Sequence, residues 1–360
     1  MTALFAPLTL RGVTFDNRIW VSPMCMYACE GEPGVVGDWH IAHYGQFALG
    51  GAGLIVTEAT AVVPEGRVTP QDAGLWNDSQ VAPWRRVTDV VHAAGSRIAV
   101  QLGHAGRKGG KYRGLPGDEF RNTSVPLDSG GWQTTGATGQ PFGRYDAPRP
   151  ATPGTLDEIV RAYADAARRA HEAGFDVIEI HAAHGYLLHE LLSPLTHAPD
   201  EFDGRDIGAR EKALFDTVDA VRSAWPAEKP LFVRLSVSDA AMGGTTAEDT
   251  ADLARRLKNH GVDLIDCSSG GLLAGSDYSP YPGYQVAGSA HVRSAGQIPT
   301  SAVGLITSPI QAEAIVASGQ ADAVMLGREM LRDPHWARSA ARELDHSGTS
   351  PNPRYHRAYL

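Results

Sequence analysis

Two histidines and a tyrosine stand close together in the segment HAAHGYLLHELLSP. His181 and His184 follow a predicted strand three residues apart, and Tyr186 comes two residues later. Two imidazoles in one pocket could donate hydrogen bonds to a substrate oxygen, and a phenol beside them could donate a proton. A zinc site is an alternative, although it would need a third ligand and an open position. A third interpretation is that one or both histidines are satisfied within the core.

Other residues with chemical potential end neighbouring predicted strands. Cys25, in SPMCMY, could be a nucleophile, a redox-tuning thiol or a small buried hydrophobe. Gln101 and Arg234 end two later strands, and an amide with a fixed cation suits a planar heterocycle that carries both donors and acceptors. Flavin and pyrimidine rings have this character. Arg234 could instead pair with Glu179 or Asp266 on nearby strands.

Glycine and arginine at the ends of the last two predicted strands indicate a phosphate site. Gly304 ends the seventh strand, and Gly327 with Arg328 ends the eighth. Glycine allows close approach of the backbone, and arginine can form two hydrogen bonds with phosphate oxygens. The alternative is that Gly327 makes only a tight turn and Arg328 pairs with a surface carboxylate.

The elements that must position these residues are short apolar runs alternating with helical patterns. The runs are mostly continuous, which is typical of parallel strands covered by helices. Eight such units predict an α/β fold, a (β/α)₈ or TIM barrel whose catalytic groups lie at the carboxyl ends of the strands. A doubly wound open sheet is the alternative. The predicted strands are 18–23, 53–59, 97–104, 176–182, 231–236, 263–269, 298–304 and 322–328.

One long segment interrupts this alternation. Between residues 105 and 154 the chain is rich in Gly, Pro, Thr and Asp and has little periodicity. A loop of this length after the third strand is typical of a functional lid. The helix after it is predicted to begin with a capping box formed by Thr155 and Glu158. We therefore expect a single domain over 1–360, with a capping insertion at about 105–154 and a C-terminal tail at about 345–360.

Composition excludes several classes of protein. The 360 residues carry a formal net charge of −9, which argues against general nucleic-acid binding. No apolar run approaches the roughly 20 residues that span a bilayer. Cys25, Cys29 and Cys267 form neither a disulfide framework nor a CxxC pair, and the N-terminal residues lack the pattern of a signal peptide. We expect a cytoplasmic protein that binds neither nucleic acid nor a membrane.

Taken together, the motifs resemble those of the old yellow enzyme family, most closely its thermophilic-like ene-reductase subclass. SPMCMY, TEATAV, QLGHAGRK, HAAHGYLLHELLSP, VRLS and VMLGRE follow one another on successive predicted strands. The resemblance extends from Phe5 to about Pro334. Classical members carry threonine where Cys25 stands and often asparagine where His184 stands, whereas the subclass has cysteine and histidine.

The resemblance implies a barrel that binds FMN tightly and non-covalently and takes hydride from NADPH. Arg234 would then stabilise the anionic reduced flavin electrostatically. Gly304, Gly327 and Arg328 would hold the phosphate. The residues implied to contact the rest of FMN are Ser22, Pro23, Met24, Cys25, Ala59, Gln101, Arg234 and Ser268.

The resemblance also implies the reaction, in which the activated C=C bond of an α,β-unsaturated carbonyl or nitro compound is reduced by a ping-pong mechanism. His181 and His184 would bind the substrate oxygen, with Tyr27 as a further donor and Cys25 against the flavin. Tyr186 would protonate the α-carbon.

The subclass forms homodimers or dimer-built homotetramers, in which a C-terminal arginine reaches into the partner's site. In the tail PRYHRAYL this residue is Arg357, with Arg354 as the alternative. From the residues alone, two other functions remain open. One is a zinc-dependent TIM-barrel hydrolase using His181 and His184, and the other is a non-catalytic barrel that binds a phosphorylated ligand.

Overall fold

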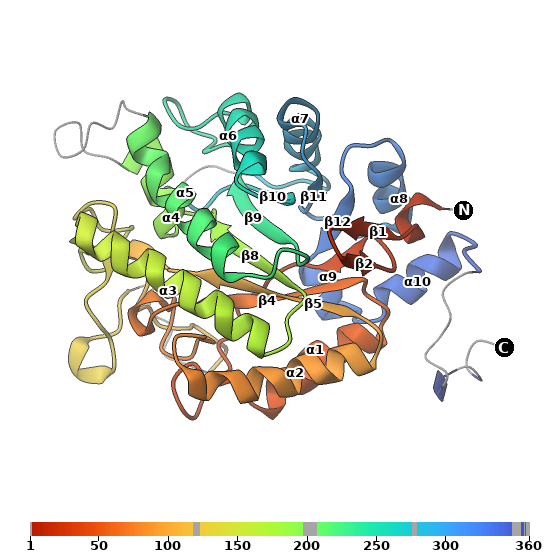
Figure 1. Ribbon diagram of the computed structural model, residues 1–360, viewed down its shortest axis with the longest axis horizontal. Coiled ribbons are helices and arrows are strands. Elements are labelled where there is room, and N and C mark those ends of the chain that lie inside the picture. The colour runs from red at the N-terminus through yellow and green to blue at the C-terminus, as the bar shows by residue number, and fades with distance from the viewer. Residues whose placement is uncertain are drawn as a thin grey trace.

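The computed structural model describes residues 2–117, 123–196, 207–275 and 279–347, together with 354, 355 and 357. Eight parallel strands close into a barrel (Figure 1). Seven lie within the predicted apolar runs, and β4 extends to Ala61, beyond the predicted run 53–59. Pairing of the first barrel strand with the last, through Val324 and Ile19, closes the sheet and excludes the open doubly wound alternative. In spatial order the strands are β3 (Ile19–Val21), β4 (Leu54–Ala61), β5 (Arg97–Gly103), β8 (Val177–Ala182), β9 (Leu231–Ser236), β10 (Leu264–Ser268), β11 (Thr300–Ala302) and β12 (Ala323–Leu326).

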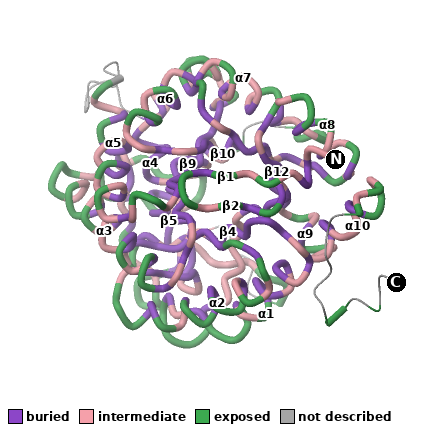
Figure 2. Tube along the Cα trace, turned by 45° about the vertical axis from the view of Figure 1, so that its right-hand side comes forward, coloured by how far each residue is buried: buried purple, intermediate pink, exposed green. Residues whose placement is uncertain are grey.

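Helices surround the barrel, with their exposed residues on the outside (Figure 2). Their apolar faces and the outward-facing strand residues form a large buried cluster that includes Ile55, Val100, Tyr163 and Leu257. The helices are α1 (Asp38–Leu49), α2 (Val81–Ala93), α3 (Pro153–Glu172), α4 (Leu187–Leu192), α5 (Ile207–Ala224), α6 (Ala247–Asn259), α7 (Val286–Gly296), α8 (Pro309–Ala317), α9 (Arg328–Arg332) and α10 (Trp336–Glu343).

The start of α3 differs from the sequence prediction. Thr152, not Thr155, is the N-cap, and its hydroxyl accepts a hydrogen bond from the Thr155 backbone N–H. Pro153 at the first helical position has no N–H to leave unsatisfied, and its ring already fixes a helical φ. The helix therefore takes Thr152 as its N-cap rather than Thr155. The predicted capping box of Thr155 and Glu158 is therefore wrong.

The amino-terminal end of the barrel is closed by a hairpin that the sequence analysis did not predict. Strands β1 (Leu8–Leu10) and β2 (Val13–Phe15) pair antiparallel. Phe15 packs against Trp20 and Phe232 inside the barrel, with ring centroids 5.0 and 6.4 Å away. Apolar side chains thus fill this end, and the polar strand residues lie toward the opposite, carboxyl end.

The predicted insertion is irregular in its described part. It contains the short 3₁₀ turns η4 (Gly106–Lys108) and η5 (Leu127–Ser129) and the two-residue strands β6 (Thr135–Gly136) and β7 (Arg149–Pro150), while residues 118–122 lie outside the described residues. Its function as a cap stays a prediction. Within the described part of the chain, no helix combines the length and apolar character needed to cross a membrane.

Candidate active site

The structure brings His181, His184 and Tyr186 together at the carboxyl end of β8. The His181 ring lies 5.1 Å from the His184 ring and 4.9 Å from the Tyr186 ring, centroid to centroid, and is nearly perpendicular to both. His181 belongs to the strand, and the other two belong to the turn that leads into α4. Three polar rings therefore face one small volume at the barrel mouth.

The turn between β8 and α4 has an unusual backbone. His184 has φ +60° and Gly185 has φ +71°, both in the left-handed region. A non-glycine residue there costs free energy, and such residues cluster at functional sites. Gly185 is also needed for space, because a Cβ would lie 2.4 Å from the carbonyl oxygen of Gly271. The His184 backbone N–H donates to Ser236 Oγ at 3.1 Å, and Lys108 Nζ donates to the His184 carbonyl oxygen at 2.8 Å.

Both histidines are neutral. Burial, and then the positive charge of Arg234, hold the pKa of His181 and of His184 well below the ordinary value. The Ala183 backbone N–H donates to His181 Nδ1 at 3.3 Å, so the proton of this ring is on Nε2. His184 Nε2 lies 2.7 Å from Ser268 Oγ. Each ring thus retains one N–H donor.

Tyr186 is a protonated phenol. Burial raises its pKa well above the ordinary value, and negative charge on Cys25 or Tyr27 would raise it further. Tyr186 is partly exposed to solvent. Lys108 Nζ lies 5.1 Å from the centroid of the Tyr186 ring. The phenol can therefore donate a hydrogen bond or a proton at neutral pH.

Cys25 and Tyr27 lie in the loop after β3. Burial raises the pKa of both, and the nearby charges of Asp72 and Glu58 raise both further. Cys25 is therefore a thiol at neutral pH, which argues against a nucleophilic thiolate. Tyr27 has φ +57°, a second non-glycine residue of this site in the left-handed region.

A buried polar layer forms the floor of the site. Gln101 Nε2 donates to Glu179 Oε1 at 2.7 Å, and Arg234 Nε lies 3.1 Å from Asp266 Oδ2. Of the two carboxylates considered as partners for Arg234, Asp266 is the one that lies at ion-pair distance. Burial, and then repulsion from Asp266, raise the pKa of Glu179, while burial also raises that of Asp266 despite the nearby guanidinium.

The predicted ring-contacting residues lie on adjacent strands around this floor. A bulge in β4 between Val56 and Ala59 places Ala59 opposite Gln101 on β5. Ser22 Oγ and Ser268 Oγ lie 3.4 and 3.5 Å from the terminal nitrogens of Arg234. Pro23 and Met24, like Cys25, follow β3 and are partly exposed.

One cavity of about 170 Å³ connects the floor with the ends of the last two strands. Its walls contain Arg234 and Ser268 at one end of the predicted site and Gly304, Gly327 and Arg328 at the other. Gly304 has φ +126°, which only glycine adopts without strain. At Gly327, by contrast, a Cβ would make only ordinary contacts, 3.7 Å from Met24 Sδ, so protein packing alone does not require glycine there.

Two sequence predictions are not assembled within this chain. Arg354 and Arg357 are exposed. A third ligand for zinc is also missing beside His181 and His184, because the described residues contain no group of three or more His, Cys, Asp or Glu side chains arranged around a metal position.

Lys108 is a residue of the mouth to which the sequence analysis gave no role. Its Nζ donates to the carbonyl oxygens of His184 and Gly271 at 2.8 and 2.9 Å, and it lies 4.7 Å from the centroid of the Phe142 ring. Burial lowers its pKa to about 8. The available clue was its place four residues after His104 in QLGHAGRK, directly after a predicted strand end.

Comparison with known proteins identifies the family. The model of the NADH:flavin oxidoreductase / NADH oxidase family matches residues 3–347. The chain belongs to this family. The NADPH dehydrogenases of Geobacillus sp. (strain WCH70) and Bacillus subtilis (strain 168) are each 43% identical to it over 343 residues, covering 95% of this chain and 95% of the relative.

Solved structures of the family have the same fold. Morphinone reductase is 27% identical with a TM-score of 0.78, covering 98% of this chain and 92% of that chain. The old yellow enzyme homologue from Zymomonas mobilis is 26% identical with a TM-score of 0.77, covering 96% and 94%. The chain spans about half, 52%, of 2-naphthoyl-CoA reductase, where 24% identity and a TM-score of 0.84 show a shared fold alone.

These findings make the chain an FMN-dependent oxidoreductase of the old yellow enzyme type that uses NADPH. The residues at the barrel mouth fit FMN. Among the described residues, buried Arg234 Nε has no hydrogen-bond acceptor, and the terminal nitrogens make only long contacts. A buried cation facing a cavity that ends at Gly304 and Arg328 suits an elongated ligand with electronegative ring atoms and a phosphate.

Proposed function

We propose that this enzyme reduces the activated C=C bond of α,β-unsaturated carbonyl or nitro compounds. Bound FMN would accept hydride from NADPH and pass it to the alkene, the two substrates using one pocket in turn in a ping-pong sequence. The family assignment supports the cofactor and reductant, and the arrangement of His181, His184 and Tyr186 supports the substrate class.

The observation that carries this proposal is the meeting of two neutral imidazoles and one protonated phenol, with the His184 and Tyr186 ring centroids 5.1 and 4.9 Å from that of His181. His181 would offer Nε2–H to the carbonyl or nitro oxygen. His184 would offer Nδ1–H, with its Nε2 accepting a hydrogen bond from the Ser268 hydroxyl at 2.7 Å. These hydrogen bonds strengthen as negative charge develops on that oxygen, so they stabilise the transition state more than the substrate.

Tyr186 is the proposed proton donor to the α-carbon. Its raised pKa keeps the proton on the phenol until the α-carbon becomes basic. Tyr27, also a protonated phenol, is the proposed further hydrogen-bond donor to the substrate oxygen. Cys25 would lie against the ring as a neutral thiol.

The remaining residues of the site are proposed to hold FMN tightly and without a covalent bond. Arg234 and Gln101 would face the pyrimidine end, Ser268 the ribityl chain, and Gly304, Gly327 and Arg328 the phosphate. All of these residues except Gln101 line one cavity, which supports this assignment.

We further propose a homodimer, or a homotetramer built from dimers, in which Arg357 or Arg354 enters the partner's site. The exposure of both arginines supports this. The three free cysteines are compatible with a cytoplasmic enzyme. The proposed partners are small activated alkenes rather than nucleic acid or membranes.

The visible spectrum of the purified protein under anaerobic conditions tests the function. We expect flavin bands that bleach with NADPH and return when cyclohexenone is added. Bands that bleach but do not return with cyclohexenone, other enones or nitroalkenes would overturn the proposed substrate class while leaving the flavoenzyme assignment intact.

A further inference from the structure

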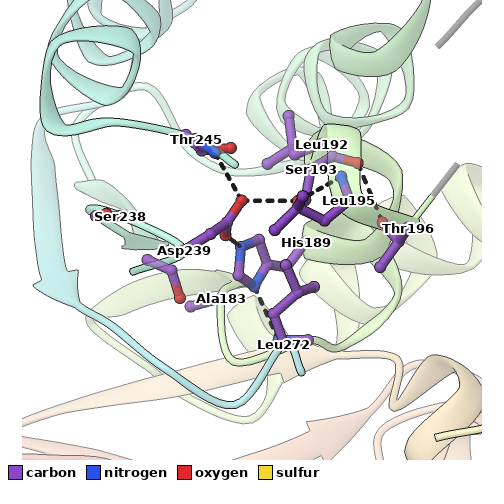
Figure 3. A network of polar contacts seen from close by, with 12 residues as sticks. Ala183, His189, Leu192, Ser193, Leu195, Thr196, Ser238, Asp239, Thr245 and Leu272 are labelled. Carbon is purple, nitrogen blue, oxygen red and sulfur yellow. Dashed lines mark hydrogen bonds and ion pairs between the residues drawn. The ribbon is translucent and has the colours of Figure 1, made fainter. Parts of the chain in front are cut away.

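A buried network outside the barrel touches the turn that carries His184 and Tyr186. His189 lies on α4 and Asp239 follows β9. The Nε2 atom of His189 is 2.9 Å from Oδ1 of Asp239 (Figure 3). Ser193 Oγ donates to Asp239 Oδ2 at 2.7 Å, and the Thr245 backbone N–H donates to the same oxygen at 2.7 Å. The side chains of His189 and Asp239 are 4% and 0% exposed.

The other nitrogen of the His189 ring contacts the turn that carries His184 and Tyr186. The Gly185 backbone N–H donates to His189 Nδ1 at 2.8 Å. Because a backbone N–H can only donate, Nδ1 must carry a lone pair, and the proton of the neutral ring is on Nε2, facing Asp239. Burial opposes ionisation of Asp239, but the hydrogen bonds from His189, Ser193 and Thr245 lower its pKa, so the acceptor is a carboxylate.

Gly185 is the residue between His184 and Tyr186. With His184 at φ +60° and Gly185 at φ +71°, this turn is not a conformation that the local sequence favours. Its other anchors hold the His184 backbone through Ser236 and Lys108. Lys108 and His189 thus hold the two ends of one peptide group, the carbonyl oxygen of His184 and the N–H of Gly185, after which the chain continues to Tyr186.

We propose that His189, oriented by Asp239, is a positioning residue that fixes the Gly185 peptide and thereby aims His184 and Tyr186 at the substrate. The proposal rests on the proposed function of those two residues. The Asp239 carboxylate fixes the tautomer of the His189 ring, and Nδ1 of the ring then accepts a hydrogen bond from the Gly185 backbone N–H. Carboxylates orient metal-binding histidines in the same way. His189 itself touches neither cofactor nor substrate in this scheme.

Two substitutions at position 189 separate positioning from simple support of the fold. Asparagine places its Oδ1 as many bonds from the backbone as histidine Nδ1, so His189→Asn keeps the acceptor for Gly185 and loses the donor to Asp239. Glutamine places its Nε2 as many bonds from the backbone as histidine Nε2, so His189→Gln keeps the donor and loses the acceptor. Both variants remove the imidazole.

The experiment measures the alkene half-reaction of the FMN-loaded enzyme by stopped flow, with cyclohexenone. We expect His189→Gln to be slower by about tenfold or more and His189→Asn to restore most of that rate, since small misplacements of catalytic groups cost rate steeply. Thermal unfolding and flavin content serve as controls for folding. Equal rates in the two folded variants would overturn the proposal, whereas a wild-type enzyme that reduces no activated alkene would instead overturn the proposed function.

A measurement on the wild-type protein keeps the proposal testable if a variant does not fold. Nitrogen chemical shifts of ¹⁵N-labelled histidine distinguish the Nε2–H tautomer from the Nδ1–H tautomer and from the imidazolium ion. We expect one ring in a fixed Nε2–H state with an Nδ1 that accepts a hydrogen bond from Gly185, detectable as a coupling across that bond. An Nδ1–H or doubly protonated His189 would overturn the proposal, because neither form can accept from Gly185.

Discussion

Arg234 on β9 and Asp266 on β10 stand opposite each other in the sheet at the floor of the site, yet Arg234 Nε and Asp266 Oδ2 do not form a hydrogen bond. Their Nε and Oδ2 atoms are 3.1 Å apart, but neither has a hydrogen-bond partner of good geometry among the described residues. A buried guanidinium that is paired by charge but not by hydrogen bonds keeps donors available for a ligand. The site is thus arranged to receive an electronegative group beside Arg234.

Replacing Arg234 by methionine tests this arrangement. The variant keeps most of the side-chain volume and removes the cation, so we expect FMN affinity to fall by at least about tenfold, or about 1.4 kcal/mol. The reduction potential of the bound flavin should also fall, because the anionic reduced form loses its counter-charge. Fluorescence titration of the apoprotein with FMN measures the affinity. Arg234→Lys, which keeps charge without the planar fork, should be intermediate, and wild-type affinity in both variants would contradict the assignment.

Replacing Tyr186 by phenylalanine removes one hydroxyl and little packing. We expect the alkene half-reaction to slow by about 10² or more, in the range of general acid catalysis, while flavin reduction by NADPH stays near the wild-type rate. Stopped-flow measurement of each half-reaction separates the two effects. Equal loss in both half-reactions would show that Tyr186 supports the pocket rather than donates the proton.

Changing His181 and His184 together to alanine removes the proposed oxygen-binding donors. Phenolates resemble the enolate oxygen, so their affinity should fall by about tenfold or more as two hydrogen bonds to a charged group are lost. Titration of the flavin absorbance with a phenol gives the dissociation constant. Unchanged phenol affinity in a variant with normal flavin content would remove both histidines from the substrate site.

Glu190 on α4 should make stability depend on pH. It accepts hydrogen bonds from the backbone N–H groups of Arg107 and Ala137, at 2.9 and 3.1 Å, and burial raises its pKa from 4.5 to about 7. A carboxyl whose pKa is raised on folding binds more protons in the folded state. Its contribution is therefore full below about pH 4.5 and is lost as the pH rises through about 7.

We expect the difference in unfolding free energy between wild type and Glu190→Gln to shrink by about 1 to 3 kcal/mol between pH 4.5 and 7.5. Urea unfolding at several pH values measures it. Only the slope with pH is diagnostic, because the amide group of glutamine also changes the hydrogen bonds to the two backbone N–H groups. A difference that is constant or grows with pH would contradict the raised pKa.

The eight strands could be predicted because most are continuous apolar runs whose neighbours are helical. Their number favoured a barrel over an open sheet, and the pairing of β12 with β3 decides between the two. The residues at the strand ends could be predicted for the same reason, since parallel strands bring their carboxyl ends to one face. Lys108 was missed because its contacts are to backbone carbonyl oxygens of His184 and Gly271, which leave no pattern in the residue types.

Other features depend on competition between neighbouring residues. Thr152 and Thr155 are both good N-cap residues, and the proline between them decides the choice by fixing φ one residue after Thr152. The hairpin of β1 and β2 was missed because its strands have only three residues each, too few for a period to be visible. His189 offered no clue to its role, because the acceptor it provides is defined by the turn at Gly185.

The hairpin at the amino end also constrains how the chain folds. One aromatic neighbour of Phe15, Phe232, lies more than 200 residues later in the chain, and the backbone N–H groups of Ala3 and Leu4 donate to Glu313. Such contacts require closure of very long loops, which slows folding. The packing of Phe15 against Phe232 therefore forms only after β9 has joined the barrel.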